Sequence, residues 1–435
     1  MTCPTAVLNR LSEARSSVVG YHRFVNNAKV TSQQIMEGHY RVLSKRIKGK
    51  DLICAQDTTE YNYNHHKNIL KEGQLGTISD NSSLGLRVHP MLVMDMDGFP
   101  YGISSLQILN RVNKTQDRYE RKYEQLPIEQ KESYRWLKGI IETKDRLSKS
   151  RSITIVADRE SDIYQLWSRT LDSKTHLVIR TAFKRKFIDD EGEEIRAVSP
   201  PALLGLQQLY IPGKFGKADK SRTAELEIYS QKAYTLKPKW ANKKKTQDLD
   251  KIPLYVVTVR EVVPADIVVK EPIEWILLTD IDVPSLEKAA EIIAIYKSRW
   301  NIEQVFRLTK QKGFALEESQ LETAHALTNM ITLVLIAAIR IFQMVKSRAD
   351  QVRPATDVFD AKEIESLKKI NPGLEGKTER SRNRNAANSL AFYVWVIARL
   401  GHWKPEDRDP PGPITMKRGW DAFNNFTTVS KMISP

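Results

Sequence analysis

Two short apolar segments, each ending on an aspartate, constrain the fold of this chain more than any other feature. Residues 52–56 precede Asp57, and residues 152–157 precede Asp158. Apolar and β-branched runs of this length are typical of strands buried on both faces. In α/β proteins, catalytic groups often lie where such strands end. The alternative is that each aspartate starts a turn, and Asp162 could simply cap the helix that follows.

The segments around these strands alternate between strand and helix patterns. Two further strands are predicted at 87–94 and 101–108, joined through Asp97-Gly98, which is a hairpin signal. A charged helix over about 129–149 and an amphipathic helix after Asp162 complete the order strand, strand, strand, helix, strand, helix. This order opens an RNase H-like fold, in which the first and fourth strands are neighbours. We therefore predict an α/β protein whose RNase H-like catalytic core brings Asp57 and Asp158 together.

The rest of the chain divides into three predicted regions. Residues 1–50 look helical and basic, with Thr31 or Ser32 as an N-cap, and residues 348–435 form a mostly helical C-terminal region with a Pro-rich tail. The catalytic domain is predicted over 51–347. Within it, 181–270 carries short alternating runs, which predict a β-rich insertion. Its basic clusters, which could also be ordinary solvated loops, are Lys184-Arg185-Lys186 and Lys243-Lys244-Lys245.

The composition limits the kinds of binding partner and the cellular compartment that fit this chain. The net charge of +15 suits a polyanionic partner, nucleic acid before membrane, although a basic surface kept for solubility is the alternative. Cys3 and Cys54 make neither a disulfide framework nor a zinc site. The longest apolar run, 333–339, is too short to span a bilayer, and the first residues lack the pattern of a signal peptide. We expect a cytoplasmic protein without a membrane partner.

A late helix carries an unusual polar stripe. Residues 292–311 contain no Pro or Gly, and a strand at 275–279 precedes them. At about 100° per residue, four side chains of this segment fall within a stripe about 60° wide. They are Tyr296, Arg299, Glu303 and Lys310. A solvated face of helical ion pairs is the alternative interpretation.

Three carboxylates therefore stand in order along the chain: Asp57, Asp158 and Glu303. Carboxylates that face one point repel one another unless cations neutralise them. Hard oxygen ligands select Mg²⁺, with Mn²⁺ as a substitute. Two such ions about 4 Å apart can activate an attacking oxygen and stabilise the leaving oxygen of a phosphodiester. Arg299 and Lys310 would then neutralise the phosphate.

At this point the chain resembles the bacterial cut-and-paste DDE transposases, specifically the family that carries a Tyr-Arg-Glu-Lys signature. The signature spacing is met by Tyr296, Arg299, Glu303 and Lys310. The family's Asp-Thr-Thr motif matches Asp57-Thr-Thr, and its Asp-Arg-Glu-x-Asp motif matches residues 158–162. The resemblance covers roughly residues 21–420.

The resemblance implies a reaction and a set of partners. It implies hydrolysis at transposon ends, closure of a DNA hairpin, and strand transfer to target DNA, all at one two-metal site. Trp275 would hold a flipped base, and Arg180 and the basic clusters would contact double-stranded transposon-end DNA. The N-terminal region would bind the DNA end, and the C-terminal region would form the homodimer of the synaptic complex. In the bacterial cytoplasm the DNA-bound protein would associate with the nucleoid.

The resemblance leaves two alternatives open. Family members usually carry more basic helical turns before the segment matched here by residues 20–24. A chain with a shortened N-terminal region could be a non-cleaving inhibitor that acts by dimerisation. An RNase H-like nuclease with another substrate would share the carboxylates.

Overall fold

The structure is a computed structural model. The chain forms two compact units. Unit 1 comprises 1–48, 58–115 and 301–435, and unit 2 comprises 49–57 and 116–300. The structure describes residues 6–8, 15–112, 126–182, 185–196, 203–211, 221–237, 251–263, 269, 272–310, 313–406 and 409–433.

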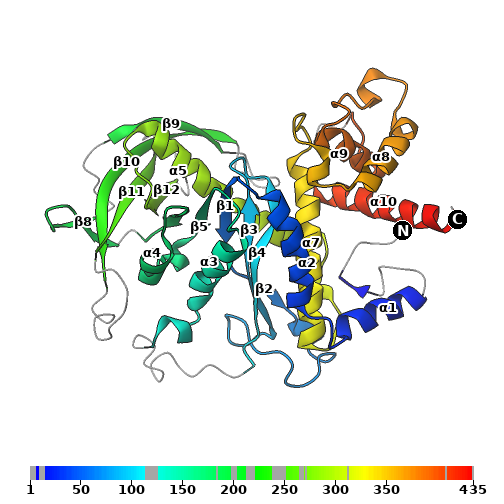
Figure 1. Ribbon diagram of the computed structural model, residues 1–435, viewed down its shortest axis with the longest axis horizontal. Coiled ribbons are helices and arrows are strands. Elements are labelled where there is room, and N and C mark those ends of the chain that lie inside the picture. Colours follow the sequence, from blue (N-terminus) through cyan, green and yellow to red (C-terminus); the bar gives the residue numbers. More distant parts are fainter. Residues whose placement is uncertain are drawn as a thin grey trace. The chain divides into compact units, whose positions relative to one another are not determined.

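Unit 2 is built on a mixed sheet (Figure 1). Three parallel strands come first, in the order β1 (Asp51–Gln56), β5 (Ser152–Ala157), β6 (Thr175–Arg180). Antiparallel strands then follow in the order β12 (Glu274–Thr279), β11 (Lys251–Val262), β10 (Arg222–Leu236). The predicted contact between the first strand and the Asp158 strand is confirmed, because β1 pairs with β5 from Asp51↔Ser152 to Ala55↔Val156.

The strand-rich segment of unit 2 extends beyond that sheet. Its further strands are β7 (Lys186–Ile188), β8 (Glu194–Arg196) and β9 (Leu203–Ile211). β9 pairs with β10 along most of its length, and β7 joins β10 through the single pair Tyr234↔Ile188. The alternating runs seen in the sequence therefore do form strands.

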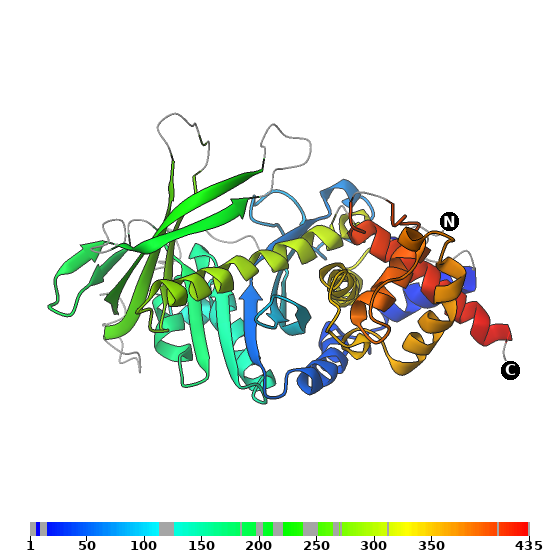
Figure 2. The same ribbon diagram turned by 90° about the horizontal axis from the view of Figure 1, so that it is seen from above.

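Helices cover the sheet of unit 2. α5 (Leu286–Ser298) packs against β1, β5, β6, β9 and β10, and lies along the sheet (Figure 2). Its Ile292 side chain is buried. Gly205 permits close approach, because a Cβ at this position would lie 2.7 Å from Leu286. α3 (Tyr134–Arg146) and α4 (Tyr164–Thr170) pack on each other.

Unit 1 combines a short antiparallel sheet with helices. The strands are β2 (Thr59–Asn62), β3 (Gly85–Met94) and β4 (Pro100–Leu109). The predicted β3–β4 hairpin is confirmed, and its turn uses Gly98 at φ +78°, a conformation that glycine adopts without strain. The N-terminal helices are α1 (Arg15–Asn26) and α2 (Ser32–Arg46).

A long helix, α7 (Ala324–Lys346), runs through the core of unit 1. The hydroxyls of Ser32 and Thr332 lie 2.7 Å apart and join α2 to it. Of the two predicted N-caps, Thr31 is the one that caps α2, and it forms a reciprocal capping box with Gln34. By length and composition alone α7 could cross a membrane, but 67% of its most apolar window is buried, as in core helices of other proteins.

The C-terminal region of unit 1 is built mainly from helices. It contains α8 (Ala361–Leu374), α9 (Leu390–Leu400) and α10 (Pro413–Ile433). α10 begins inside the Pro-rich tail, at Pro413. Proline suits the first turn of a helix, where its missing N–H has no partner to lose. Gly419 lets α10 approach α9, since a Cβ there would lie 1.8 Å from the carbonyl oxygen of Ile397.

Candidate active site

Asp57 and Asp158 directly follow two neighbouring parallel strands of unit 2. Ala55 and Val156 form the last residue pair between β1 and β5, so both aspartates come off the same edge of the sheet. Neighbouring strands lie about 4.8 Å apart. The structure therefore places two of the three predicted carboxylates at one edge, as the strand pattern predicted.

Asp57 is neutralised by an arginine of the polar stripe. Arg299 Nη1 donates to Asp57 Oδ2 at 2.9 Å, and the two side chains are 14% and 19% exposed. The guanidinium also lies 6.0 Å from the ring centre of Tyr296, which packs edge-on against Trp275 at 5.6 Å. Four predicted site residues of unit 2 thus form one connected cluster. Arg299 was expected to bind a DNA phosphate. In this structure its guanidinium binds the Asp57 carboxylate.

The helix that carries the polar stripe is interrupted at Arg299. α5 ends at Ser298, and α6 (Trp300–Thr309) begins one residue after Arg299. The Ser298 hydroxyl donates to the Ile295 carbonyl at 2.6 Å, which is the acceptor that Arg299 N–H would use in an uninterrupted helix. Arg299 N–H donates to Tyr296 O at 3.1 Å instead. The expectation of one continuous helix over 292–311 was therefore wrong.

Asp158 begins a tight 3₁₀ turn, Arg159–Ser161. Its carboxylate accepts the Glu160 N–H at 3.0 Å, and the Ser161 hydroxyl donates to its carbonyl at 2.7 Å. Glu160 in turn accepts from Arg135 of α3 at 2.9 Å. The turn that carries Asp158 is therefore held by its own hydrogen bonds and by one helix.

Asp162 does not cap the following helix. The N-cap of α4 is Ile163, which makes no side-chain cap, while the Asp162 carboxylate accepts a hydrogen bond from Thr181. The capping alternative for Asp162 was wrong, because Thr181 and Arg185 face this side chain instead.

Glu303 and Lys310 belong to unit 1. Glu303 lies half-exposed in the first turn of α6. Lys310 follows the last residue of α6, and its ammonium lies 5.7 Å from the ring centre of Tyr61. The roles of Glu303 and Lys310 remain predictions from the sequence.

Residues 120–340, just over half of the chain, match the family model described as a transposase DDE domain. The chain belongs to this family. The matched segment contains Asp158 and Glu303, whereas Asp57 precedes it. The assignment of Asp57 therefore rests on its position beside Asp158 in the sheet.

DDE transposases generally use divalent metals. Among the described residues, no group of three or more His, Cys, Asp or Glu side chains is placed to hold a metal ion. Asp57 and Asp158 still fit a hard divalent cation, because both are carboxylates at the same strand edge. Arg299 supplies the positive charge that Asp57 needs in this structure.

Of the remaining residues predicted to contact DNA, three have protein partners in this structure and four lie outside the described residues. Arg180 ends β6, where it donates to Glu274 O at 3.3 Å. Lys186 pairs with Glu194 at 2.7 Å, and Arg185 donates to Thr235 at 3.0 Å, so both cations already have protein partners. The other predicted basic-cluster residues lie outside the described residues; they are Lys184, Lys243, Lys244 and Lys245.

The sequence did not reveal the side chains that support the site. Ser298, Arg135 and Thr181 each fix a predicted site segment, yet none of them stands in a pattern that marks it. Arg135 and Thr181 act on residues 25 and 19 positions away. Only Ser298, placed three residues after the carbonyl that it binds, follows a local rule that could have indicated the helix break.

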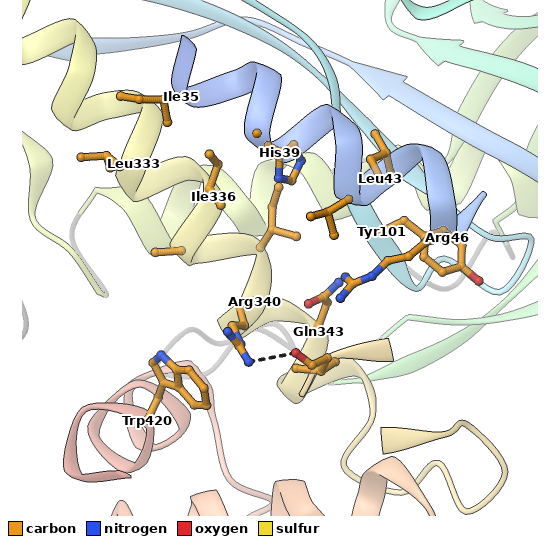
Figure 3. A pocket seen from close by; sticks show the side chains of 15 residues that line it. Ile35, His39, Leu43, Arg46, Tyr101, Leu333, Ile336, Arg340, Gln343 and Trp420 are labelled. Carbon is orange, nitrogen blue, oxygen red and sulfur yellow. Dashed lines mark hydrogen bonds between the residues drawn. The ribbon is translucent and has the colours of Figure 1, made fainter. Parts of the chain in front are cut away.

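A separate groove of about 540 Å³ lies within unit 1, between faces of α2 and α7 (Figure 3). Three of its polar side chains have backbone partners: His39 Nε2 accepts from Ile103 N–H at 2.9 Å, Gln343 donates to Pro100 O at 2.7 Å, and Arg340 donates to Val358 O at 2.9 Å. No carboxylate is found among the described residues that line it. This groove is therefore not a candidate for the reaction site.

Proposed function

We propose that the chain is a DNA transposase that cleaves and joins phosphodiester bonds by cut-and-paste transposition. The observation that carries the proposal is that Asp57 and Asp158 follow adjacent parallel strands in a chain that matches a transposase DDE domain. The parallel run β1-β5-β6 supports an RNase H-like core. The bacterial cytoplasm is the compartment that fits this function.

In this proposal Asp57, Asp158 and Glu303 hold two Mg²⁺ ions, with Mn²⁺ as a substitute. When bound, such ions supply a polarised attacking oxygen and a stabilised leaving oxygen. The 3₁₀ turn fixes the carboxylate of Asp158, which limits the motion of a ligand that must hold its position through both steps. The case for Glu303 rests on the Tyr-Arg-Glu-Lys spacing.

The cations of the signature would act on DNA. Arg299 would exchange its bond with Asp57 for a scissile-strand phosphate once the carboxylate is neutralised by metal, and Lys310 would bind a second phosphate. Trp275, half-buried and in edge contact with Tyr296, would stack on a flipped base while a hairpin forms. Transposon-end and target DNA are the proposed substrates, and a homodimer is the proposed synaptic form.

A cleavage assay tests the proposal. The purified chain is incubated with Mg²⁺ and a plasmid that carries the ends of its own element, and strand breaks are counted on gels. Glu303→Ala and Asp158→Asn should each lower the rate by about 1000-fold or more. Glu291→Ala is the matched control, because Glu291 is an exposed carboxylate of α5 that pairs with Lys288.

Full activity of Glu303→Ala would show that Glu303 is not a ligand of the catalytic metal ions. Absence of cleavage by the unmodified chain, with inhibition of a longer active relative, would favour the dimerising inhibitor. A preference for RNA–DNA hybrid over transposon ends would favour the nuclease.

A further inference from the structure

Asp162 is a buried carboxylate that the proposed reaction does not use. Its side chain is only 7% exposed. One oxygen, Oδ2, accepts from the hydroxyl of Thr181, which follows β6. The other, Oδ1, lies 3.5 Å from Arg185 Nη2, just before β7. Asp162 therefore touches two elements that lead into the strand-rich insertion.

Arg185 ties Asp162 to the interior of that insertion. The same Nη2 atom donates to Thr235 Oγ1 at 3.0 Å, and Thr235, on β10, is 2% exposed. A movement of β10 would therefore move the guanidinium that faces Asp162. The connection runs from β10 through one arginine to one carboxylate.

On its other side, Asp162 closes the turn that Asp158 opens. Asp162 N–H donates to Arg159 O at 3.3 Å, and the Ser161 hydroxyl donates to Asp158 O at 2.7 Å. Glu160 N–H binds the Asp158 carboxylate itself. Because the five residues are bonded to one another, the position of Asp162 fixes that of Asp158.

The ion pair between Asp162 and Arg185 is not closed by a hydrogen bond. At 3.5 Å it is an ion pair but longer than an ordinary charge-assisted hydrogen bond, which is about 2.8 Å. Within the described part of the chain, Asp162 Oδ1 has no hydrogen-bond partner, and this is costly for a buried carboxylate oxygen. A shift of Arg185 by less than one ångström would satisfy it.

We propose that Asp162 is a positioning residue that couples the insertion to the turn carrying Asp158. DNA bound by the insertion draws Arg185 onto Asp162, and the completed ion pair rigidifies the turn. The identification of Asp158 as a catalytic residue and the binding of DNA by the insertion both rest on the proposed function. The coupling itself is carried by the Asp158–Asp162 turn, Thr181, Arg185 and β10.

Hydrogen exchange tests the coupling without any cleavage. The amides of the Asp158–Asp162 turn are followed in the full chain, with and without a fluorescein-labelled DNA duplex, in a Ca²⁺ buffer. DNA should slow their exchange by about fivefold or more in the unmodified chain. Asp162→Asn, which keeps an acceptor for Thr181 but loses the charge, should abolish this effect. Arg185→Gln should do the same, and the double variant should show no additional loss.

Two variants serve as charge-matched controls. Glu193→Gln and Arg196→Gln change the same charges at exposed positions of the insertion, and both should keep the protection. Thr235→Val removes the anchor of Arg185 without changing any charge, and it should weaken the protection while DNA affinity, measured by fluorescence anisotropy, stays within about twofold. This variant decides the question if Asp162→Asn does not fold.

Protection in Asp162→Asn equal to that of the unmodified chain, at equal DNA affinity, would overturn the proposal. So would an unmodified chain that binds DNA without protecting the turn. Neither result depends on catalysis. A failure of Glu303→Ala to stop cleavage would instead count against the metal assignment and leave the coupling intact.

Discussion

The guanidinium of Arg299 and the carboxylate of Asp57 neutralise each other. Both side chains are less than one-fifth exposed, so neither is fully hydrated by water. An ion buried in this way without a partner loses several kcal/mol of solvation. A divalent cation that binds Asp57 must therefore compete with Arg299, and the arginine becomes available for another anion once it is displaced.

Arg299→Gln should consequently bind Mn²⁺ more tightly than the unmodified chain, by about threefold to tenfold, because the competing cation is gone. Titration followed by the Mn²⁺ electron paramagnetic resonance signal measures this directly. Arg307→Gln removes an equal charge from an exposed position of α6 and should change the affinity little. An unchanged or weaker affinity in Arg299→Gln would contradict competition at Asp57.

The break between α5 and α6 coincides with a side-chain hydroxyl that is bonded to the helix backbone. The Ser298 hydroxyl donates to the Ile295 carbonyl. Arg299 N–H donates to the carbonyl of Tyr296, which lies three residues earlier in the chain. Serine in a helix often bends it in this way. The break places the Arg299 side chain at the end of one helix rather than in the middle of a longer one.

Ser298→Ala should restore the ordinary helical bond from Arg299 N–H to Ile295 O. Alanine is also the better helix former, so the free energy of unfolding should rise by about 0.5 kcal/mol. The decisive measurement is amide exchange at Arg299, which should slow. Ser298→Thr keeps the hydroxyl and should exchange like the unmodified chain. Equal exchange in all three proteins would show that something other than the hydroxyl breaks the helix.

The elements differ in how well the sequence predicted them. The strands that end in Asp57 and Asp158 were predicted to within a residue, because buried strands carry a strong local pattern. The start of α10 at Pro413 was not predicted, since a helix that begins on proline after a Pro-rich stretch looks like a linker until its packing on α9 is known. The Asp162–Arg185–Thr235 contacts join three separate segments, and no local pattern encodes such a meeting.

At the scale of the whole molecule, two histidines give stability opposite dependences on pH. Burial, followed by the nearby charge of Arg46, lowers the pKa of His39 to about 4. The hydrogen bond to Asp280 raises the pKa of His176. The stabilisation from His176 is complete below pH 6.5 and is lost as the pH rises through its raised pKa. The stabilisation from His39 is complete above pH 6.5 and is lost as the pH falls.

The chain should therefore lose stability between about pH 6.5 and pH 4, by as much as about 3 kcal/mol from His39, because the folded state resists the proton that the unfolded chain accepts. Urea denaturation at several pH values measures the effect. His39→Gln should flatten this part of the profile, whereas His65→Gln, at an exposed position, should not. An unchanged slope in His39→Gln would contradict a neutral, buried His39.

The hydrogen bond between Ser32 and Thr332 joins two helices that are synthesised at very different times. The two residues are 300 positions apart, so α2 leaves the ribosome long before the helix that covers it. At about 5–20 residues per second, the wait lasts about 15–60 s. During that interval the apolar side chains of α2 that are buried in the finished protein, Met36 and Leu43, have no native neighbour on α7. Newly made chains are thus expected to engage chaperones through α2, and to release them only when translation passes residue 346.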